Sequence, residues 1–365
     1  MTNPNQEKIN WLRLARSENV GSVTFFRLIE AFDTATRALE RVSELKSNVV
    51  ICSKEKAEQE LEEIKNFGAE LLLFSDEKYP QSLREIPGPP PTLTVKGEVD
   101  FLQRNCVAIV GARNASLNSI NFARSIAVEI GNHSTIIVSG VARGIDTAAH
   151  EAAIMSGTIG VIAGGINTTY PKENEGLYRH ILDYGLLISE FPFNSSPLKE
   201  NFIQRNRLIS GLSLATIVVE AGLRSGSLST ARFAAEQGRE VFAVPGSPFD
   251  LRCKGTNRLI KEGATIFENV EDFLISFPHL KMAFTQVNRE KRPADISNQY
   301  SEISNGDIKK IREEILQKLN HVPIDIEDII HDLQISPKLV NVALVELEME
   351  NKIEMNFGRA AILPS

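Results

Sequence analysis

The sequence predicts an α/β protein built around a doubly wound parallel sheet, with smaller parts before and after the sheet. In the middle of the chain, six short apolar runs alternate with helical patterns, as in a parallel sheet covered by helices on both faces. Before and after that region, apolar residues recur at helical spacing. A chain of 365 residues is long enough for about two or three domains.

The first part of the chain indicates helices around a short turn. In residues 11–40 the helical spacing is interrupted at Asn19, Val20, Gly21 and Ser22. Two helices joined in this way resemble a helix-hairpin-helix or SAM-like unit, which can present backbone N–H groups to phosphate. Because only one degenerate copy is present, we favour a packing or interaction module. The proline-rich stretch 87–97 then predicts an extended, semi-rigid bridge.

The middle of the chain is interpreted as the sheet itself. Its apolar runs are CVAIVG, TIIVSG, TIGVIAGG, GLLISE, LATIVVE and EVFAVPG. Continuous apolar strands separated by helices predict an extended Rossmann-like domain. Domains of this class bind ligands beyond the carboxyl ends of their strands.

The last part of the chain predicts a winged-helix-like domain. We expect helices at 307–319, 324–331 and 336–349 and a hairpin at 352–363. A DNA reader would place the third helix in the major groove and carry basic or amide side chains on it. This helix carries Lys338, but Glu346, Glu348 and Glu350 lie at its end. Negative charge there opposes phosphate, so we favour a role in protein contact or packing over duplex reading.

These patterns divide the chain into four stretches. The residues after the sheet region are polar and lose their periodicity, which is typical of a linker. The expected limits are 1–85 for the helical domain, 86–276 for the Rossmann-like domain, 277–305 for the linker and 306–365 for the winged-helix-like domain.

Composition excludes several classes of function. The net charge of −7 argues against a protein that coats duplex DNA indiscriminately, although a local basic cleft remains compatible with it. No apolar run approaches the roughly 20 residues of a membrane span, and the start lacks the pattern of a signal peptide. Cys52, Cys106 and Cys253 are scattered, so we expect free thiols in a reducing cytoplasm, with no disulfide and no metal site.

Five segments near the expected carboxyl ends of the strands could hold an anion. They offer glycine, serine and basic residues where backbone N–H groups and helix N-termini favour negative charge. The segments are GARNAS from Gly111, SGVARGID from Ser139, the stretch from Gly164 to Asn174, SSPLKENFIQRNR and LRSGS. One such loop is weak support for a site, but five at the same sheet edge favour one. Their candidate residues include Arg113, Lys172, Lys199, Phe202, Arg205, Asn206, Arg207 and Arg224.

The anion does not fit a common nucleotide cofactor. The chain lacks a GxGxxG turn followed by a ribose-binding acid, and it also lacks the P-loop, HExxH and GxSxG motifs. We therefore expect no cofactor. Separate phosphate sites along one edge suit a single nucleic-acid strand better, with Phe202 as a base-stacking face. A plain core role for Phe202 is the alternative. We interpret His150 as a core or capping residue.

The ordered motifs resemble the DNA processing protein A (DprA, or Smf) family. They run in order through the middle domain as GAR..S, SG.ARGID..AH, GG....YP..N, PLKENF..RNR.ISGLS, VVEAG..SGSL.TA, GR.VFAVPG and GTN.LI..GA. The resemblance implies a dimeric single-stranded-DNA-binding protein of natural transformation, which protects incoming strands and loads the RecA recombinase. It also implies phosphate contacts at Arg113, Lys172 and Lys199, a base contact at Phe202, and a pocket lined by Ser139, Gly140, Arg143, Gly144, Ser225, Gly226 and Ser227.

The alternative is an enzyme similar to nucleotide phosphoribohydrolases of the lysine-decarboxylase-like group. Such enzymes need a carboxylate in the helix after the glycine-rich loop, and this chain has Ala231 and Arg232 there. The remaining acids have other expected roles: Asp146 as a helix N-cap, and Glu220 as an orienter of neighbouring arginines. We therefore expect a protein that is not an enzyme. Release of base from nucleoside monophosphates would favour the alternative.

Overall fold

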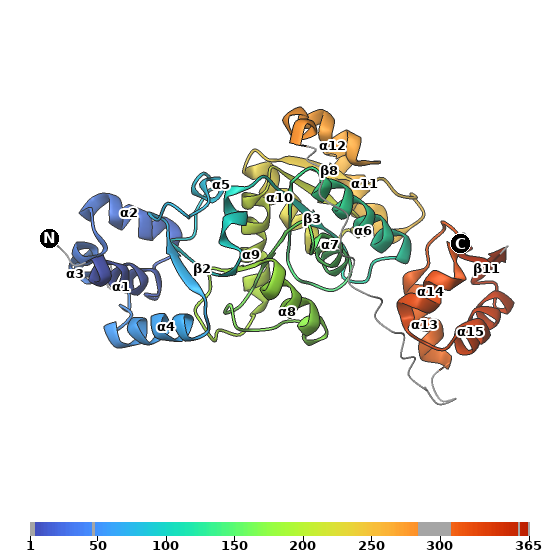
Figure 1. The fold of residues 1–365 in the computed structure, drawn as a ribbon, viewed down its shortest axis with the longest axis horizontal. Coiled ribbons are helices and arrows are strands. Elements are labelled where there is room, and N and C mark those ends of the chain that lie inside the picture. Colours follow the sequence, from blue (N-terminus) through green and yellow to red (C-terminus); the bar gives the residue numbers. More distant parts are fainter. Residues whose placement is uncertain (1–3, 46–47, 284–307, 357, 364–365) are drawn as a thin grey trace.

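The computed structural model describes residues 4–45, 48–283, 308–356 and 358–363. The chain forms a helical N-terminal part, a large central α/β part and a small C-terminal part (Figure 1). The N-terminal helices are α1 (Pro4–Ala15), α2 (Ser22–Phe32), α3 (Ala35–Leu45) and α4 (Lys54–Asn66). As the sequence predicts, a short turn joins the first two of these helices.

Helices α1 and α2 pack on the proline-rich bridge. The Ser22 hydroxyl donates a hydrogen bond to the Pro89 carbonyl, and the Trp11 indole N–H donates to the Pro91 carbonyl at 2.9 Å. These bonds tie the helical domain to the start of the sheet domain. They also place the Ser22 hydroxyl against protein, which fits the packing role expected for this unit.

The central sheet has nine strands in the order β1-β2-β6-β5-β4-β3-β7-β8-β9. Their bounds are Glu70–Leu73, Thr92–Gly97, Cys106–Val110, Ile136–Ser139, Thr158–Val161, Leu186–Ser189, Ala215–Val218, Glu240–Ala243 and Thr265–Ile266 for β1 to β9. Strands β3 to β9 pair in parallel, whereas β2 pairs antiparallel with both β1 and β6. The doubly wound class is confirmed, and the chain order reverses direction at β3.

Helices cover both faces of the sheet. They are α5 (Gln81–Arg84), α6 (Leu117–Asn132), α7 (Ile145–Ala153), α8 (Glu175–Tyr184), α9 (Lys199–Leu212), α10 (Ser227–Glu236), α11 (Lys254–Lys261) and α12 (Val270–Ser276). Alternate residues of β3 point to opposite faces: Ile109 packs in the core that includes α6 and α7, whereas Ala108 packs in the core that includes α9. All five residues of β3 are buried, which explains its uninterrupted apolar sequence.

Three strands of the nine-stranded sheet lie outside the predicted set. The bridge 87–97, expected to be an extended connection, ends in strand β2. Strand β1 comes from the stretch that was expected to be helical. Strand β9 has only two residues, and both are exposed. The expected domain limits stay predictions, and most of the expected linker 277–305 lies outside the described residues; Pro278–Ala283 within it form a 3-10 helix.

The C-terminal part is a winged-helix domain that contacts the α/β domain. It contains α13 (Ile308–Lys318), α14 (Ile326–Leu333), α15 (Pro337–Met349) and a sheet of order β10-β12-β11, at Ile324–Asp325, Arg359–Ile362 and Ile353–Asn356. The Asn118 amide donates to Asn320 Oδ1 at 2.8 Å and to the Val322 carbonyl at 2.9 Å. Arg252 Nη1 donates to the Gln317 carbonyl at 2.9 Å. Among the described residues, no helix is long and apolar enough to cross a membrane.

Candidate functional site

Two pockets open where the parallel strands end, and they share the side chains of Arg113 and Phe202. The first, here called the central pocket, has a volume of about 530 Å³ and lies between the loops after β3 and β7 and helices α9 and α10. The second, the side pocket, has a volume of about 490 Å³ and lies beside the loops after β4 and β5. We call the two together the groove. Its position matches the strand edge at which the sequence predicts a ligand.

The carboxylate of Asp146 fixes the turn after β4 through hydrogen bonds. One carboxylate oxygen of Asp146 accepts hydrogen bonds from the backbone N–H groups of Gly140, at 3.1 Å, and Ala142, at 3.4 Å. Burial raises the pKa of this carboxyl, while Arg205 and the two N–H groups oppose the rise. The expected N-cap role is wrong, because Gly144 occupies the N-cap position of α7 and Asp146 lies within the helix.

Gly144 is required by the conformation of the same turn. Its φ of +77° lies in the region that L side chains rarely adopt, and a Cβ there would lie 2.3 Å from the Ala112 carbonyl oxygen. The loops after β3 and β4 therefore approach each other closely at this point. The close approach brings Arg113 and Arg143, one from each loop, to the same end of the sheet.

Arg205 is buried under the groove. Its side chain donates to the Gly140 carbonyl at 2.7 Å and to the Val161 carbonyl, and the residue is only 4% exposed. Burial lowers its pKa to about 10, so the guanidinium stays charged at neutral pH. Arg205 therefore joins α9 to the ends of β4 and β5 and places a positive charge beneath the pockets.

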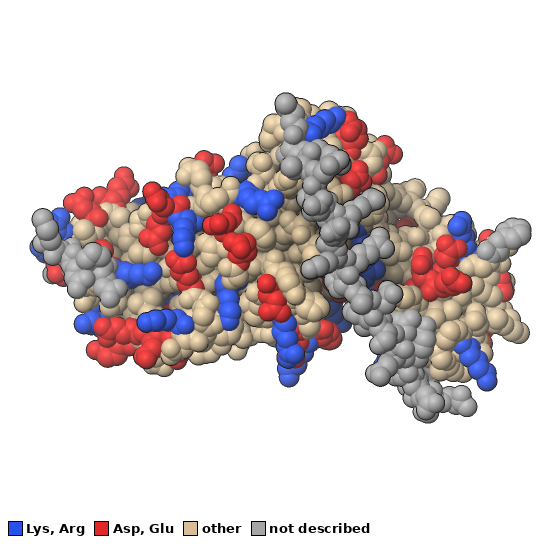
Figure 2. Space-filling view, viewed as in Figure 1, with Lys and Arg blue, Asp and Glu red and all other residues tan. Residues whose placement is uncertain are grey.

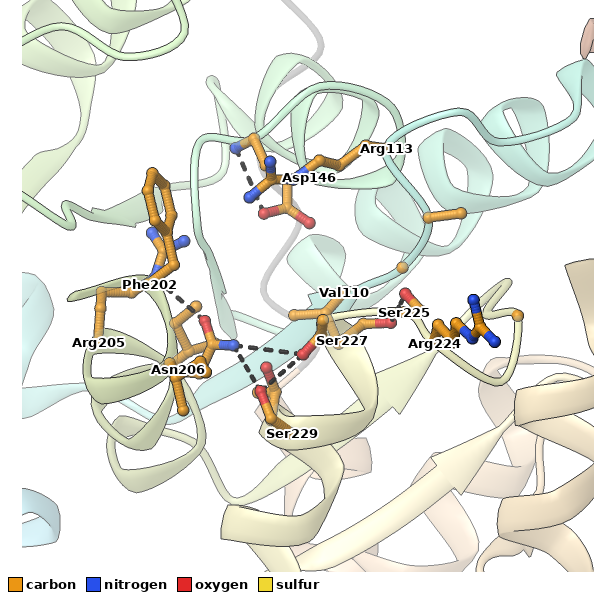
Figure 3. A pocket seen from close by; sticks show the side chains of 18 of the residues that line it. Val110, Arg113, Asp146, Phe202, Arg205, Asn206, Arg224, Ser225, Ser227 and Ser229 are labelled. Atoms are coloured by element: carbon orange, nitrogen blue, oxygen red, sulfur yellow. Dashed lines mark hydrogen bonds between the residues drawn. The ribbon is translucent and has the colours of Figure 1, made fainter. Parts of the chain in front are cut away.

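Phe202 lies at the wall shared by the two pockets. Its ring is half-buried, and the Arg113 guanidinium lies 5.3 Å from the ring centroid (Figure 3). The centroid of the Tyr170 ring lies 5.4 Å from that of Phe202. A cation near an aromatic face is attracted by the ring quadrupole. Phe202 is thus not the plain core residue of the alternative interpretation. Tyr170, 49% exposed, is a second aromatic face beside it. The sequence did not single out Tyr170 as a base contact, although its position in a loop after a strand could have indicated one.

Exposed cations line or flank the groove. None of them forms an ion pair with another described residue; they are Arg113, Arg143, Lys172, Lys199 and Arg224. Lys199 does not line either pocket, but it precedes Phe202 by three residues on α9 and so lies on the same side of the helix. On the face seen in Figure 2, acidic and basic side chains are interspersed over the N-terminal domain. The unpaired positive charge of the groove is therefore local, in a chain of net charge −7.

The start of α10 forms the far wall of the central pocket. The hydroxyls of Ser225 and Ser227 lie 2.7 Å apart, and the Asn206 amide donates to Ser229 Oγ at 2.9 Å and to the Gly226 carbonyl (Figure 3). Helix N-termini favour anions, because their first N–H groups lack partners within the helix. The serines and Gly226 thus line the pocket as the sequence predicts.

Four predicted site residues line neither pocket of the groove: Ser139, Gly144, Lys199 and Arg207. Ser139 is fully buried, and its hydroxyl donates to the Ile109 carbonyl at 2.6 Å. Arg207 pairs with the buried carboxylate of Glu190, and it lines neither pocket. Glu220 does not orient an arginine; it accepts hydrogen bonds from the hydroxyls of Ser116 and Ser119, at 2.7 and 2.8 Å.

His150 lies in the interior beneath the turn after β4. The imidazole of His150 is buried, contacts Thr158 Oγ1 at 2.6 Å and accepts the Val141 N–H at 3.4 Å, consistent with a core residue that supports the turn. Across the described ranges, no cluster of His, Cys, Asp and Glu is placed to hold a metal ion.

Comparison with known proteins identifies the family. The model of the family described as DNA recombination-mediator protein A matches residues 70–278, more than half of the chain. Models described as a DprA-like N-terminal HHH domain and a DprA winged helix domain match residues 5–62 and 307–356. The chain belongs to this family. The resemblance inferred from the ordered motifs is confirmed, as are the small domains on either side of the sheet.

Individual relatives agree with this assignment. The DNA processing protein DprA of Bacillus subtilis is 43% identical over 201 residues, which are 54% of this chain and 68% of the relative. Protein Smf of Escherichia coli is 44% identical over 188 residues, 51% of this chain but only 50% of that protein.

Solved structures show the same fold. The X-ray structure of DprA from Streptococcus pneumoniae matches with a TM-score of 0.64 and 32% identity, over 75% of this chain and 98% of that one. A structure of DprA from Helicobacter pylori, described for its single-stranded DNA binding mode, matches with a TM-score of 0.54 and 30% identity, over 58% of this chain and 96% of that one.

Proposed function

We propose that this chain binds single-stranded DNA in the groove and acts as a recombination mediator. The observation that carries the proposal is the position of Phe202, half-exposed between two pockets, with Arg113 against its ring and unpaired cations around it. Stacking faces beside basic groups hold single strands without reading their sequence. The described binding mode of the Helicobacter pylori relative supports the same ligand.

The predicted site residues then have proposed roles. Arg113, Arg143, Lys172 and Lys199 contact phosphates, and the N–H groups at Ser225, Gly226 and Ser227 form a further phosphate site. Phe202 stacks on a base, with Tyr170 beside it. The remaining predicted residues act by shaping the site. Gly140 and Gly144 form the turn after β4, and Arg205 and Asn206 hold the surrounding loops through hydrogen bonds. Ser139 and Arg207 support the site through interactions in the interior.

The wider role is proposed from the family. A recombination mediator delivers single strands to a recombinase, so we infer that the protein protects incoming DNA during natural transformation and loads RecA, which places it in the cytoplasm. We also propose a homodimer. The terminal strand β9 supports this proposal, because Ile266 on it is 47% exposed and Ile275 on the following helix is 67% exposed.

A role without catalysis is favoured over a phosphoribohydrolase. Asp146 is the acid that lines the central pocket, and two backbone N–H groups already occupy one of its carboxylate oxygens. Incubating the protein with nucleoside monophosphates should release no base. Base release that disappears in an Asp146→Asn variant would overturn this part of the proposal.

A titration with fluorescent DNA tests the central proposal. Single strands should bind more tightly than a blunt duplex of equal length, and the logarithm of the binding constant should fall with the logarithm of salt by about 0.7 per phosphate contact. Equal affinity for both forms, or a flat response to salt, would contradict the groove as a single-strand site.

A further inference from the structure

A third pocket lies between the α/β domain and the winged-helix domain. It has a volume of about 310 Å³, and we call it the interdomain pocket. The loops after β3 and β4 and the helices α6 and α7 form one side of it, and the ends of α13 and α14 form the other. The charged residues that line it are Arg113, Arg124, Arg143, Glu151, Lys318 and Asp332.

The interdomain pocket carries excess positive charge. Four cations face two carboxylates, which leaves two positive charges. Arg124 pairs with Glu151 at 3.4 Å and Lys318 pairs with Asp332 at 3.1 Å, whereas Arg113 and Arg143 have no ion pair within the described part of the chain. An anion entering the pocket would therefore meet two unpaired guanidinium groups first.

The interdomain pocket continues the groove. Arg113 lines all three pockets, and Arg143 lines both the side pocket and the interdomain pocket. A polyanion that contacts these arginines in the groove therefore lies at the entrance of the interdomain pocket.

The docking of α13 adds a cation to this path. The carboxyl end of a helix carries partial negative charge, which would repel a phosphate. Here Arg252, which also pairs with Asp250 at 3.0 Å, donates to the carbonyls of Gln317, at 2.9 Å, and Leu319, at 2.5 Å, so hydrogen bonds from a guanidinium satisfy these two carbonyls. Lys318, between these two residues, directs its side chain to the pocket and to Asp332.

We propose that a bound single strand runs from the groove into the interdomain pocket, where its next phosphate contacts Arg143 and Lys318. The inference rests on the proposed function of the groove. It makes the winged-helix domain a wall of the single-strand path, using the end of α13, and not a reader of duplex DNA through α15. Asp332 competes with the phosphate for Lys318.

Binding of oligo-dT to the full chain tests the inference. Lys318→Ala should weaken binding of an oligomer of about 16 nucleotides by ~2–5-fold and make the salt slope shallower by about 0.7. An oligomer of about 4 nucleotides, bound in the groove alone, should not respond. Asp332→Asn should have the opposite effect and tighten binding of the long oligomer. Lys318→Arg should bind normally, because it keeps the charge.

Matched controls separate this site from folding and from the groove. Lys309→Ala removes an exposed cation from the first turn of the same helix, outside the pocket, and should bind like the wild type. The double variant Lys318→Ala/Asp332→Asn leaves no unpaired carboxylate and should keep the loss. If the wild type prefers single strands but Lys318→Ala matches it at both lengths, the inference is wrong and the groove stands. If the wild type shows no such preference, the proposed function itself fails.

Discussion

Arg205 and Arg113 both approach the ring of Phe202, but their surroundings are opposite. Arg205 is buried and donates to the carbonyls of Gly140 and Val161, so its hydrogen-bonding groups serve the fold. Arg113 is exposed, and no acidic side chain among the described residues pairs with it. We call the residues whose polar groups bind other parts of the protein the interior set: Arg205, Arg207, His150 and Asp146. Arg143, Lys172, Lys199 and Arg224 belong with Arg113 as a rim set.

A basic residue in a binding motif therefore has one of two separable effects. Interior residues fix the loops, so their loss should lower the free energy of unfolding. Rim residues have unpaired charge, so their loss should alter DNA binding and its salt dependence while the fold stays intact. The two sets can therefore be distinguished by measuring stability and binding on the same variant.

The largest effect is expected for Arg207→Ala. The substitution leaves the carboxylate of Glu190 buried without its partner, and burial already raises the pKa of that carboxyl. Breaking such a pair costs about 3–5 kcal/mol, which denaturant unfolding should show as a lower free energy of unfolding. The salt slope of DNA binding should stay unchanged while the protein is folded. Replacing both partners with apolar residues should cost less. A stable Arg207→Ala variant with a shallower slope would move Arg207 to the rim set.

His150 tests the interior set through pH. Burial lowers its pKa to about 3, with Arg205 adding to the effect, whereas the ordinary value is 6.5. Between these values the unfolded chain binds a proton that the native state does not, so stability is lost as the pH falls. Relative to His150→Gln, the wild type should lose up to about 1.4 kcal/mol per pH unit below pH 6.5.

The difference between the two proteins isolates the histidine. Burial raises the pKa values of Asp146 and Glu190, which has the opposite dependence on pH, but both carboxyls are present in both proteins. Urea unfolding at a series of pH values measures the difference. A difference that stays constant with pH would place His150 in contact with water.

The sequence predicts the sheet well because burial leaves a local pattern. Strands β3 to β8 were all found as apolar runs, since five of them are buried along their whole length. Strand β9 has two exposed residues and so leaves no pattern. Strand β2 was not predicted, because the prolines before it indicate an extended connection and because its pairing with β6 depends on residues far along the chain.

The site was predicted less completely, for a geometric reason. Residues 205, 206 and 207 follow one another on α9, where successive side chains point about 100° apart. Packing of Leu208 and Ile209 against the sheet fixes the rotation of α9 and so decides which of residues 205–207 faces the groove. A sequence motif does not contain that packing contact. The same holds for the interdomain pocket, whose residues Arg124 and Lys318 are brought together by domain docking.

Phe202→Ala should weaken binding of single strands at every salt concentration. Loss of a stacked base costs about 1–3 kcal/mol and exchanges no counterion, so the salt slope should change little. Because the ring is half-exposed, the melting temperature of the free protein should stay near that of the wild type. Phe202→Tyr keeps the ring and should bind nearly normally. An unfolded or strongly destabilised Phe202→Ala protein would show that the ring belongs to the interior.

The smallest effects are expected at the rim, where Lys199→Ala and Arg113→Ala each remove one proposed phosphate contact. Each should make the salt slope shallower by about 0.7, equally for all DNA sequences, with no change in the melting temperature. The two should still differ, because Arg113 also lies 5.3 Å from the Phe202 ring centroid. Part of the loss in Arg113→Ala should therefore persist at high salt, whereas the loss in Lys199→Ala should vanish there.

Arg232→Ala is the matched control, since Arg232 is exposed on α10 but lines neither pocket of the groove. A slope change in that control as large as in the rim variants would mean that general charge, and not the groove, holds the strand.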